Sequence, residues 1–546
     1  MRLLVVLLVV IRTIGCGTEP APPVTPGNAQ ASIGTNLSEV HPWEENIPFV
    51  DAMKTSDEWR SDQGPVDVDA HGWVRSLAPG QSAYTVMFGD FAHGYPDGEY
   101  IVRYDGEGTI TYDGGARKVD AKSVTGRDVI SVDHTRDQIV LTIRATNPSN
   151  YIRNISVLMP GGACSNDGAR LCHESSDCTT GATCVSFERI YKTQIFYPPF
   201  LASLKPYSTI RFMAWMRPND NWLDPNGPTY PHWSGRVLPD DARYSGARGV
   251  PLEVMVALAN RLHSNPWFTI DYLANDADVT AFATYVRDHL APDLKVYIEH
   301  SNEVWNPEYP QHQYAVSQAY AEGINTSDEF ESALRYHSKR SVEIAEIFEQ
   351  VFGGTSRLVR VMGSQAYNPW VSQTLLDYGD ALQHTDALGI APYVGSTIEY
   401  GDYGRLMGMT LDQLFTEVST HYFDDAMNAI TGSEAVASAR GVGLVAYEAG
   451  QQLVQWNAPQ YALSDPNSLA SKFVAMNRDP RMKQLYLNYF NAWKAAGGGL
   501  AMHYYAVGSY TRFGSWGALE YLGEPRSSAP KYDALLTFSA SNPPWW

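Results

Sequence analysis

Residues 296–306 read Val-Tyr-Ile-Glu-His-Ser-Asn-Glu-Val-Trp-Asn, a short apolar run that ends in a cluster of polar side chains. Residues 443–450 read Gly-Leu-Val-Ala-Tyr-Glu-Ala-Gly, where a second apolar run ends on a glutamate. Short apolar runs bounded by polar residues and glycine are typical of buried strands in parallel sheets. Each stretch therefore predicts a strand with a glutamate at its carboxyl end.

Both stretches belong to a pattern of apolar strand, loop and amphipathic helix that repeats from about Phe200 to the end of the chain. Such alternation predicts parallel βα units, with helices at 252–262, 276–290 and 482–495. The expected strands span residues 31–37, 209–213, 267–270, 295–299, 358–362, 387–391, 443–447 and 499–504. Eight strands close a barrel, so the predicted fold is an α/β (β/α)8 TIM barrel. An open doubly wound sheet is the alternative, but no glycine-rich phosphate loop follows a strand.

The region between the first two expected strands has a different character. A helix is expected at 48–55, and residues 64–160 then alternate polar and apolar side chains in short runs separated by Gly and Asp turns. This pattern is typical of an antiparallel sandwich. We therefore predict a barrel built from residues 31–63 and 190–546, with an inserted all-β domain at 64–160.

Four cysteines, Cys164, Cys172, Cys178 and Cys184, fall within residues 161–189. In an exported chain such crowding predicts two disulfides that staple a loop, with three possible pairings. A zinc site is the alternative, but the spacing has no close Cys-x-x-Cys pair, so no metal is expected.

The N-terminus predicts export. An apolar run at 3–10 is too short to span a bilayer and is typical of a signal peptide ending at residue 16. Residues 13–16, Thr-Ile-Gly-Cys, resemble the lipobox of bacterial lipoproteins, in which Cys16 is lipidated, although Thr13 stands where leucine is preferred. A tether follows at 17–30. We expect a bacterial protein that is either secreted or anchored at the cell surface, for example as an outer-membrane lipoprotein, with no other membrane contact.

Charge and composition narrow the partners. The 546 residues carry a net charge of −20 and no run of basic residues that could follow a phosphate backbone, so nucleic acid is not an expected partner. The 14 Trp and 33 Tyr fit either an aromatic core or faces on which sugar rings stack. We expect a monomer that needs no cofactor.

The two strand-end glutamates suggest chemistry. An idle carboxylate at the end of a buried strand is costly, because an unpaired charge in low dielectric loses its hydration. Barrel chemistry takes place at the carboxyl ends of the strands, and the fourth and seventh strands face each other across the mouth. Hydrolysis of a glycoside with retention needs one carboxylic acid and one carboxylate roughly 5–5.5 Å apart. Glu303 and Glu448 are the candidates for this pair.

The string Glu299-x-x-Asn302-Glu303 after one strand, with Glu448 ending another, resembles clan A of the glycoside hydrolases. The wider string at 301–306 and the neighbourhoods 212–215 and 516–521 also look like uncharacterised secreted bacterial barrel proteins sometimes labelled cellulose-binding. The resemblance covers about residues 31–60 and 190–535. It implies that Glu303 is the acid/base, that Glu448 is the nucleophile and that Asn302 bonds the sugar 2-hydroxyl.

Other residues near the strand ends are candidates for supporting roles. Arg211 resembles the clan's arginine that supports the nucleophile, with a rim ion pair as the alternative. Tyr393 is a candidate donor to Glu448, with an ordinary rim tyrosine as the alternative. His300 alternates with Asn302 and is a candidate for the barrel interior, although a core histidine is the commoner outcome. Indole faces that are candidates for stacking on sugar rings follow three strands, at Trp305, Trp370 and Trp516.

The predicted function is a retaining glycoside hydrolase that acts on a β-linked polysaccharide or oligosaccharide. A non-catalytic glycan-binding lipoprotein on a TIM-barrel scaffold is the alternative, but a binding protein has no need of two opposed carboxylates. A metal-dependent hydrolase is disfavoured, because clusters of histidine and carboxylate ligands are missing from the strand ends.

Overall fold

The computed structural model describes residues 19–24, 27, 31–224, 229–324, 326–455 and 463–546. The predicted signal peptide, Cys16 and half of the tether lie outside these residues. No helix within the described part of the chain is long and apolar enough to cross a membrane.

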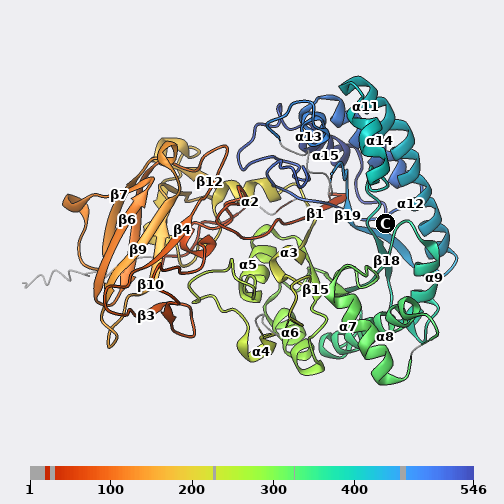
Figure 1. Ribbon diagram of the computed structural model, residues 1–546, viewed down its shortest axis with the longest axis horizontal. Helices are drawn as coiled ribbons and strands as arrows, with labels where there is room; N and C mark the ends of the chain where they lie inside the picture. The colour runs from red at the N-terminus through yellow and green to blue at the C-terminus, as the bar shows by residue number, and fades with distance from the viewer. Residues whose placement is uncertain (1–18, 25–26, 28–30, 225–228, 325, 456–462) are drawn as a thin grey trace, which may run out of the picture.

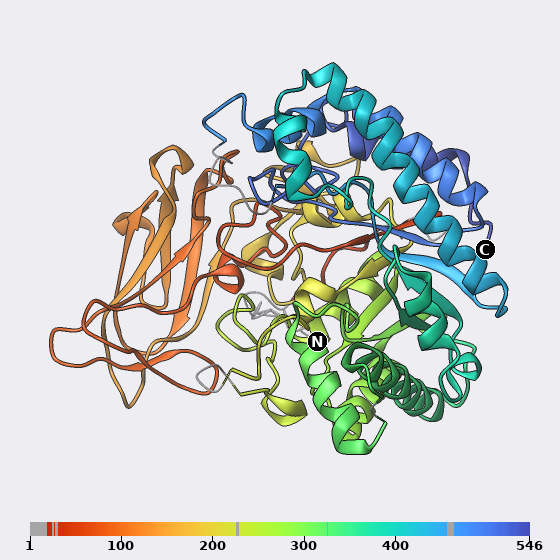
Figure 2. The ribbon, with the colours of Figure 1, turned by 45° about the vertical axis from the view of Figure 1, so that its right-hand side comes forward.

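Eight parallel strands close into a barrel in the order β1-β14-β15-β16-β17-β18-β19-β20, which confirms the predicted fold class (Figures 1 and 2). The stretches at 296–306 and 443–450 contain β16 and β19, respectively. The strands are β1 (Ile33–Asn36), β14 (Thr209–Arg211), β15 (Asn265–Ile270), β16 (Val296–His300), β17 (Leu358–Gly363), β18 (Ala387–Ile390), β19 (Gly443–Ala449) and β20 (Ala501–His503).

Helices surround the barrel, and Figure 2 shows the green helices on one side and the cyan and blue helices on another. The longer ones are α5 (Leu252–Leu262), α6 (Asp276–His289), α7 (Pro310–Glu322), α8 (Glu329–Phe352), α12 (Phe423–Ser438), α13 (Leu469–Arg478), α14 (Arg481–Ala495) and α15 (Pro530–Ser541). Shorter helices are α1 (Phe187–Ile190), α2 (Pro198–Leu204), α3 (Met213–Met216), α4 (His232–Gly235), α9 (Pro369–Leu376), α10 (Tyr403–Met407), α11 (Leu411–Glu417) and the π-helical turn η7 (Val418–Tyr422).

Local signals explain the helix ends. The side chain of Asn275 accepts from the backbone N–H of Asp278, and Asp278 returns the contact, so a capping box begins α6. Asp328 caps α8, and Gly353 ends it in the left-handed conformation that glycine adopts without strain.

The helix expected at 48–55 is wrong apart from its last turn, the 3-10 helix η1 (Ala52–Thr55). Phe49 forms a bridge with Phe196 and Asp51 with Leu158, so this backbone pairs with neighbouring segments and is not free to form helical hydrogen bonds. The helix that precedes the second barrel strand is α2 instead.

The insert between β1 and β14 is a sandwich of two antiparallel sheets, seen on the left of Figure 1, with a hairpin beside it. Fully buried side chains such as Tyr100 and Val102 from one sheet and Ile139 and Leu141 from the other form its core. One sheet has the order β10-β5-β8-β7, the other β4-β9-β6, and the hairpin is β2-β3. The strands are β2 (Asp67–Val68), β3 (Val74–Ser76), β4 (Ala83–Met87), β5 (Gly98–Asp105), β6 (Gly108–Gly114), β7 (Ala116–Lys118), β8 (Arg127–Val132), β9 (Ile139–Thr146) and β10 (Arg153–Leu158).

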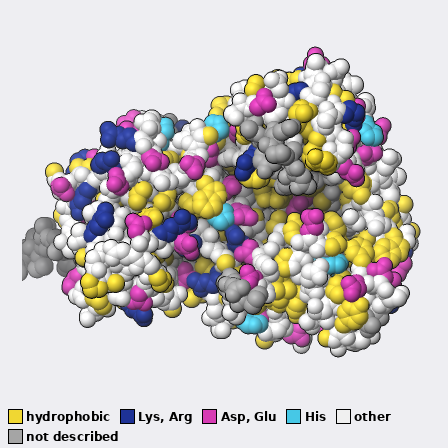
Figure 3. Space-filling view, in the orientation of Figure 1, with side chains coloured by type: hydrophobic (Ala, Val, Ile, Leu, Met, Phe, Trp, Pro, Cys, Tyr) yellow, Lys and Arg dark blue, Asp and Glu magenta, His cyan; other side chains and the backbone are white. Residues whose placement is uncertain are grey.

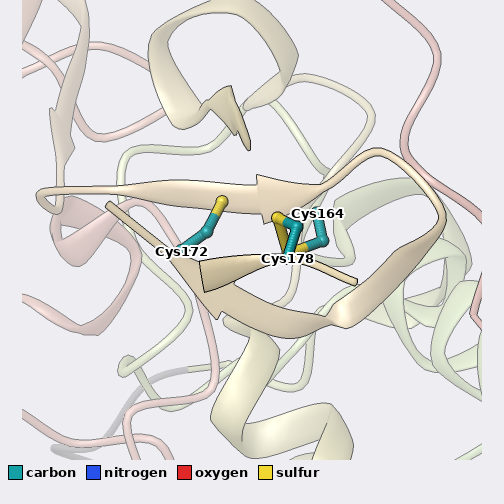
Figure 4. Close-up of side chains that lie close together, drawn as sticks. All are labelled: Cys164, Cys172 and Cys178. Carbon is teal, nitrogen blue, oxygen red and sulfur yellow. A yellow bond between two sulfur atoms is a disulfide. The ribbon is translucent and has the colours of Figure 1, made fainter. Parts of the chain in front are cut away.

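The segment with the four cysteines is predicted from the sequence to be a stapled loop. It is instead a small three-stranded sheet in the order β12-β11-β13. Its strands are β11 (Gly162–Cys164), β12 (Asp167–Cys172) and β13 (Cys184–Ser186), and Ala163 of the central strand pairs with both neighbours. Two disulfides join Cys164 to Cys178 and Cys172 to Cys184, and Figure 4 shows three of these cysteines together. Backbone pairing therefore orders a segment whose polar composition suggested a loop.

Candidate active site

Glu448 and Glu303 lie at the carboxyl ends of β19 and β16. Glu448 is the last residue but one of its strand and is 7% exposed. Glu303 follows β16 by three residues and is half-buried. Ser301 and Glu303 have φ values of +54° and +45°, a region that costs energy for residues with a Cβ. Such strain persists where the surroundings fix the backbone, and it is concentrated at functional sites.

Arg211, the last residue of β14, is fully buried and holds four side chains from three other strands and the turn after β16. Its Nη1 donates to Glu448 Oε1 at 3.0 Å and to Asn36 Oδ1 at 3.1 Å. Its Nη2 donates to Glu299 Oε2 at 3.0 Å and to Asn302 Oδ1 at 2.9 Å. One buried cation is thus shared by two buried carboxylates, and losing it would leave both uncompensated.

Both carboxylate oxygens of Glu448 accept hydrogen bonds. Tyr393 Oη donates to Glu448 Oε2 at 2.9 Å, while Arg211 donates to Oε1. Burial raises the pKa of Glu448, and the Arg211 charge and the Tyr393 hydroxyl oppose that rise by stabilising the ionised form. These are the partners that an ionised carboxylate requires in a dry site.

Glu303 contacts only neutral donors. Tyr447 Oη donates to its Oε1 at 3.3 Å, and Asn306 Nδ2 donates to its Oε2 at 3.1 Å. Burial and the charge of Glu448 raise the pKa of Glu303 to about 7. The two glutamates thus have different surroundings. The cation beside Glu448 favours its ionised form, whereas the neutral donors around Glu303 stabilise its ionised form less. Such a separation assigns acid and base roles in many enzymes.

The remaining polar residues complete a network. Asn302 donates through Nδ2 to Asn219 Oδ1 at 3.2 Å, so both ends of its amide are fixed. Glu299 accepts from Trp267 Nε1 at 2.9 Å as well as from Arg211. Sequence reasoning assigned no role to Asn36, Trp267 or Tyr447. The only signal for them is that they lie on barrel strands, and no motif marks which of their side chains point inward.

The three candidate tryptophans are placed differently. Trp516 packs edge-on against Tyr504 with ring centroids 5.8 Å apart, and Tyr504 lies 6.1 Å from Tyr393, so Trp516 belongs to the aromatic wall beside Glu448. Trp305 follows Glu303 and is half-buried. Trp370 is 42% exposed on α9 and stacks on Phe330. Their contacts with sugar rings stay predictions.

His300, the candidate for the barrel interior, is not brought to this cluster. It is buried against α8, where its Nδ1 lies 2.9 Å from Nδ1 of His337. The alternation along β16 turns Glu299 toward Arg211 and therefore turns His300 toward the helices. His300 is a core histidine.

Among the described residues, the one group with metal-ligand spacing is Cys164, Cys172 and Cys178. Their sulfurs form disulfides in the small sheet, so they offer no thiolate to a metal ion. At the barrel mouth the surface is hollowed, with acidic side chains in the hollow and apolar ones around it (Figure 3).

No protein-family model and no curated protein sequence matches the chain. Among solved structures it is similar to a 4-O-α-L-rhamnosyl-β-D-glucuronidase from Fusarium oxysporum 12S, at 13% identity over 61% of this chain and 62% of that chain, with a TM-score of 0.36. It is also similar to an endo-β-1,4-mannanase double mutant from Cellulomonas fimi, at 11% identity over 61% and 62%, with a TM-score of 0.32. A third is a GH5 family lichenase from Caldicellulosiruptor sp. F32, at 12% identity over 62% and 83%, with a TM-score of 0.36. The chain thus spans about three fifths of the first two structures, and the fold assignment rests on its own strand order.

Proposed function

We propose that the protein is a retaining glycoside hydrolase that cleaves a β-linked polysaccharide or oligosaccharide, with Glu448 as nucleophile and Glu303 as acid/base. The observation that carries the proposal is the contrast between the two glutamates. Glu448 is bound by a buried arginine and a tyrosine, whereas Glu303 meets only neutral donors and has a pKa raised to about 7. One group is thus held ionised and the other keeps a proton near neutral pH.

The reaction follows from these roles. An oxygen of Glu448 attacks the anomeric carbon while the bond from that carbon to the leaving oxygen breaks, and Glu303 gives its proton to the leaving oxygen. Formation of the ester removes the charge of Glu448, so the pKa of Glu303 falls and it now acts as a base. Water then attacks the anomeric carbon, its proton passes to Glu303, and the ester bond breaks to restore the Glu448 carboxylate. No step requires a metal or cofactor.

Arg211 and Tyr393 act on the nucleophile through hydrogen bonds to its two oxygens. By fixing the carboxylate plane they hold it in one orientation for attack, which lowers the entropic part of the barrier. Asn302, fixed by Arg211 and Asn219, is the proposed partner of the sugar 2-hydroxyl, and Trp305, Trp370 and Trp516 are the proposed stacking faces.

The test is the pair of variants Glu303→Gln and Glu448→Gln, with Glu308→Gln as the matched control, since Glu308 is an exposed acid on the same loop. Activity should fall about 100- to 10,000-fold in the first and at least about 1,000-fold in the second, and should be unchanged in the control. An aryl glycoside with an activated leaving group needs little protonation, so it should restore the glycosylation step in Glu303→Gln but not in Glu448→Gln. Polysaccharide binding without hydrolysis by the wild-type chain would instead support the glycan-binding alternative.

We also propose export of the mature chain from a bacterial cytoplasm, with Cys16 as the attachment site of a lipid. Two disulfides within a 21-residue segment support an oxidising compartment. Metabolic labelling with a radioactive fatty acid tests the anchor, because Cys16→Ser should abolish the label and release the protein from the cell surface.

A further inference from the structure

A cavity of about 740 Å³ lies between the β insert and the barrel, away from Glu303 and Glu448. The insert side is lined by Tyr104 of β5, Tyr151 just before β10 and Arg153, the first residue of β10. Lys192, just after α1, and Asp240 line the barrel side. Where the two parts meet in Figure 3, basic and acidic side chains lie close together on the surface. None of the residues in the proposed catalytic network lines this cavity.

The charged side chains of the lining disfavour an apolar ligand. Sites for small molecules enclose roughly 300–1,000 Å³, so the volume is sufficient, but such sites are mostly apolar. Here an apolar ligand would strip water from charged side chains without replacing their hydrogen bonds, at a cost of several kcal/mol for a charge. A ligand rich in hydroxyl groups both donates and accepts, and therefore suits a lining that contains both cations and carboxylates.

Several of these polar groups are available. Both hydrogen bonds of the Arg153 side chain come from Nη1, to Asn150 Oδ1 and Tyr151 O, which leaves Nε and Nη2 without an acceptor among the described residues. Within the same part of the chain, neither Arg153 nor Lys192 has a carboxylate within 4.0 Å, and Asp240 accepts no hydrogen bond. The cavity therefore presents donors from both walls and an acceptor from one.

Tyr151 supplies a fixed, half-exposed ring. Its hydroxyl donates to Asp69 Oδ2 at 2.7 Å, and the Arg153 guanidinium lies 5.6 Å from the ring centre. Contacts at the edge and at one face hold the ring in one orientation. In the proposed site the apolar C–H face of a sugar ring packs against the part of the ring that Arg153 does not cover, while its hydroxyls reach the polar groups around it.

We propose that this cavity is a second carbohydrate-binding site, formed jointly by the insert and the barrel, that holds a glycan chain outside the catalytic mouth. The cations of the two walls suit a uronic acid carboxylate as well as neutral hydroxyls. The site goes beyond the proposed hydrolysis and does not depend on it, because binding here requires neither glutamate of the catalytic pair.

The test uses the full chain with Glu303→Gln, so that binding is measured without turnover. Retardation in native gels containing a neutral β-glucan, a neutral β-mannan or a glucuronic-acid-bearing xylan is compared for this background and for Arg153→Ala/Lys192→Ala added to it. We expect at least about 10-fold weaker binding to one of these polysaccharides in the cavity variant. Preference for the xylan would identify the uronate, and equal binding of the β-glucan or the β-mannan would identify neutral hydroxyls as the ligand.

The matched control is Arg144→Ala/Arg287→Ala, which removes the same charge from exposed positions outside the cavity and should leave binding unchanged. In the active background, the cavity variant should hydrolyse a short aryl glycoside as the wild type does. Lys192→Ala alone, at an exposed side chain, serves if the double variant does not fold. Binding that is equal in cavity variant and background, or absent with all three polysaccharides, would overturn the proposal. If the wild-type chain hydrolyses none of the substrates but the cavity variant still loses binding, the result would refute the proposed hydrolysis and support the second binding site.

Discussion

Arg211 shares its buried charge between Glu299 and Glu448, and this sharing defines the electrostatics of the site. Arg211 also binds Glu299, and it donates to only one oxygen of Glu448. The second oxygen of Glu448 accepts its hydrogen bond from Tyr393. Glu303 receives no direct contact from any cation in the described part of the chain. The asymmetry between the two glutamates therefore depends on a small number of hydrogen bonds.

Tyr393→Phe tests one of these bonds. The variant keeps the ring and removes the donor to Glu448 Oε2, which leaves a buried carboxylate oxygen unsatisfied at a cost of about 1–3 kcal/mol. We expect kcat to fall about 10- to 100-fold and the pKa on the acidic limb of the kcat/KM profile to rise. Tyr367→Phe, which removes a donor to the backbone oxygen of Tyr393, is the control. An unchanged acidic limb would show that Tyr393 does not stabilise the ionised nucleophile.

The pH dependence of activity follows from the raised pKa of Glu303. Glu303 must carry its proton in the first step, so kcat/KM should rise along the acidic limb of the nucleophile and then fall as the pH rises through about 7. In Glu303→Gln the alkaline limb should disappear for a substrate with an activated leaving group. An alkaline limb that persists in this variant would assign the titration to another residue.

Glu303→Gln should lower activity but make the folded protein more stable at high pH. The folded state holds the proton of Glu303 more tightly than the unfolded state, so the ionised form is the destabilising one. The unfolding free energy of the wild type therefore declines between the ordinary glutamate pKa and about 7. Glu303→Gln should raise the Tm relative to wild type above pH 7 and change it little at pH 4.

At the scale of elements, the sequence predicts β16 and β19 well because their apolar runs end at the polar residues that matter. Arg211, Asn302, Glu448 and Tyr393 lie at strand ends, and parallel topology alone brings strand ends to one face. The 48–55 helix fails because its backbone pairs with residues distant in sequence. The inward direction of Asn36 and Trp267 depends on barrel register, which no local pattern specifies.

The small β11–β13 sheet has a structural role that can be measured. β12 packs against α2, and Gln194, in the segment before α2, donates to the backbone oxygen of Gly168 in β12. The disulfides close loops with sequence separations of 14 and 12, for which chain entropy predicts about 3 kcal/mol each. Cys172→Ala/Cys184→Ala should therefore lower the unfolding free energy by about that amount in denaturant titration. Activity on a short substrate at 25 °C should stay near wild type, and a large loss there would place the sheet in the catalytic machinery.

For the whole molecule, barrel closure is what brings the carboxyl ends of β16 and β19, and with them the proposed catalytic pair, to one mouth. Eight strands in sequence order place the fourth and seventh across the mouth, and Arg211 of the second strand reaches residues of both. The insert joins the chain between the first and second strands, so it adds mass without interrupting the strands that carry the glutamates. Separate stretches of sequence thus form the proposed catalytic site only in the closed fold.

The stereochemistry of the product reports how this unit works. Glu448 accepts hydrogen bonds from Arg211 and Tyr393 that fix its carboxylate for the proposed direct attack, so the first product should have the β configuration of the substrate. Proton NMR of the anomeric signals during the first minutes of hydrolysis distinguishes this from the α product, before mutarotation mixes them. An initial α signal would mean that Glu448 activates water across a gap of roughly 6.5–9.5 Å, and that the two glutamates act as acid and base in a single displacement. The β signal, together with a glycosyl ester on Glu448 trapped by a slow substrate and located by mass spectrometry, would establish double displacement.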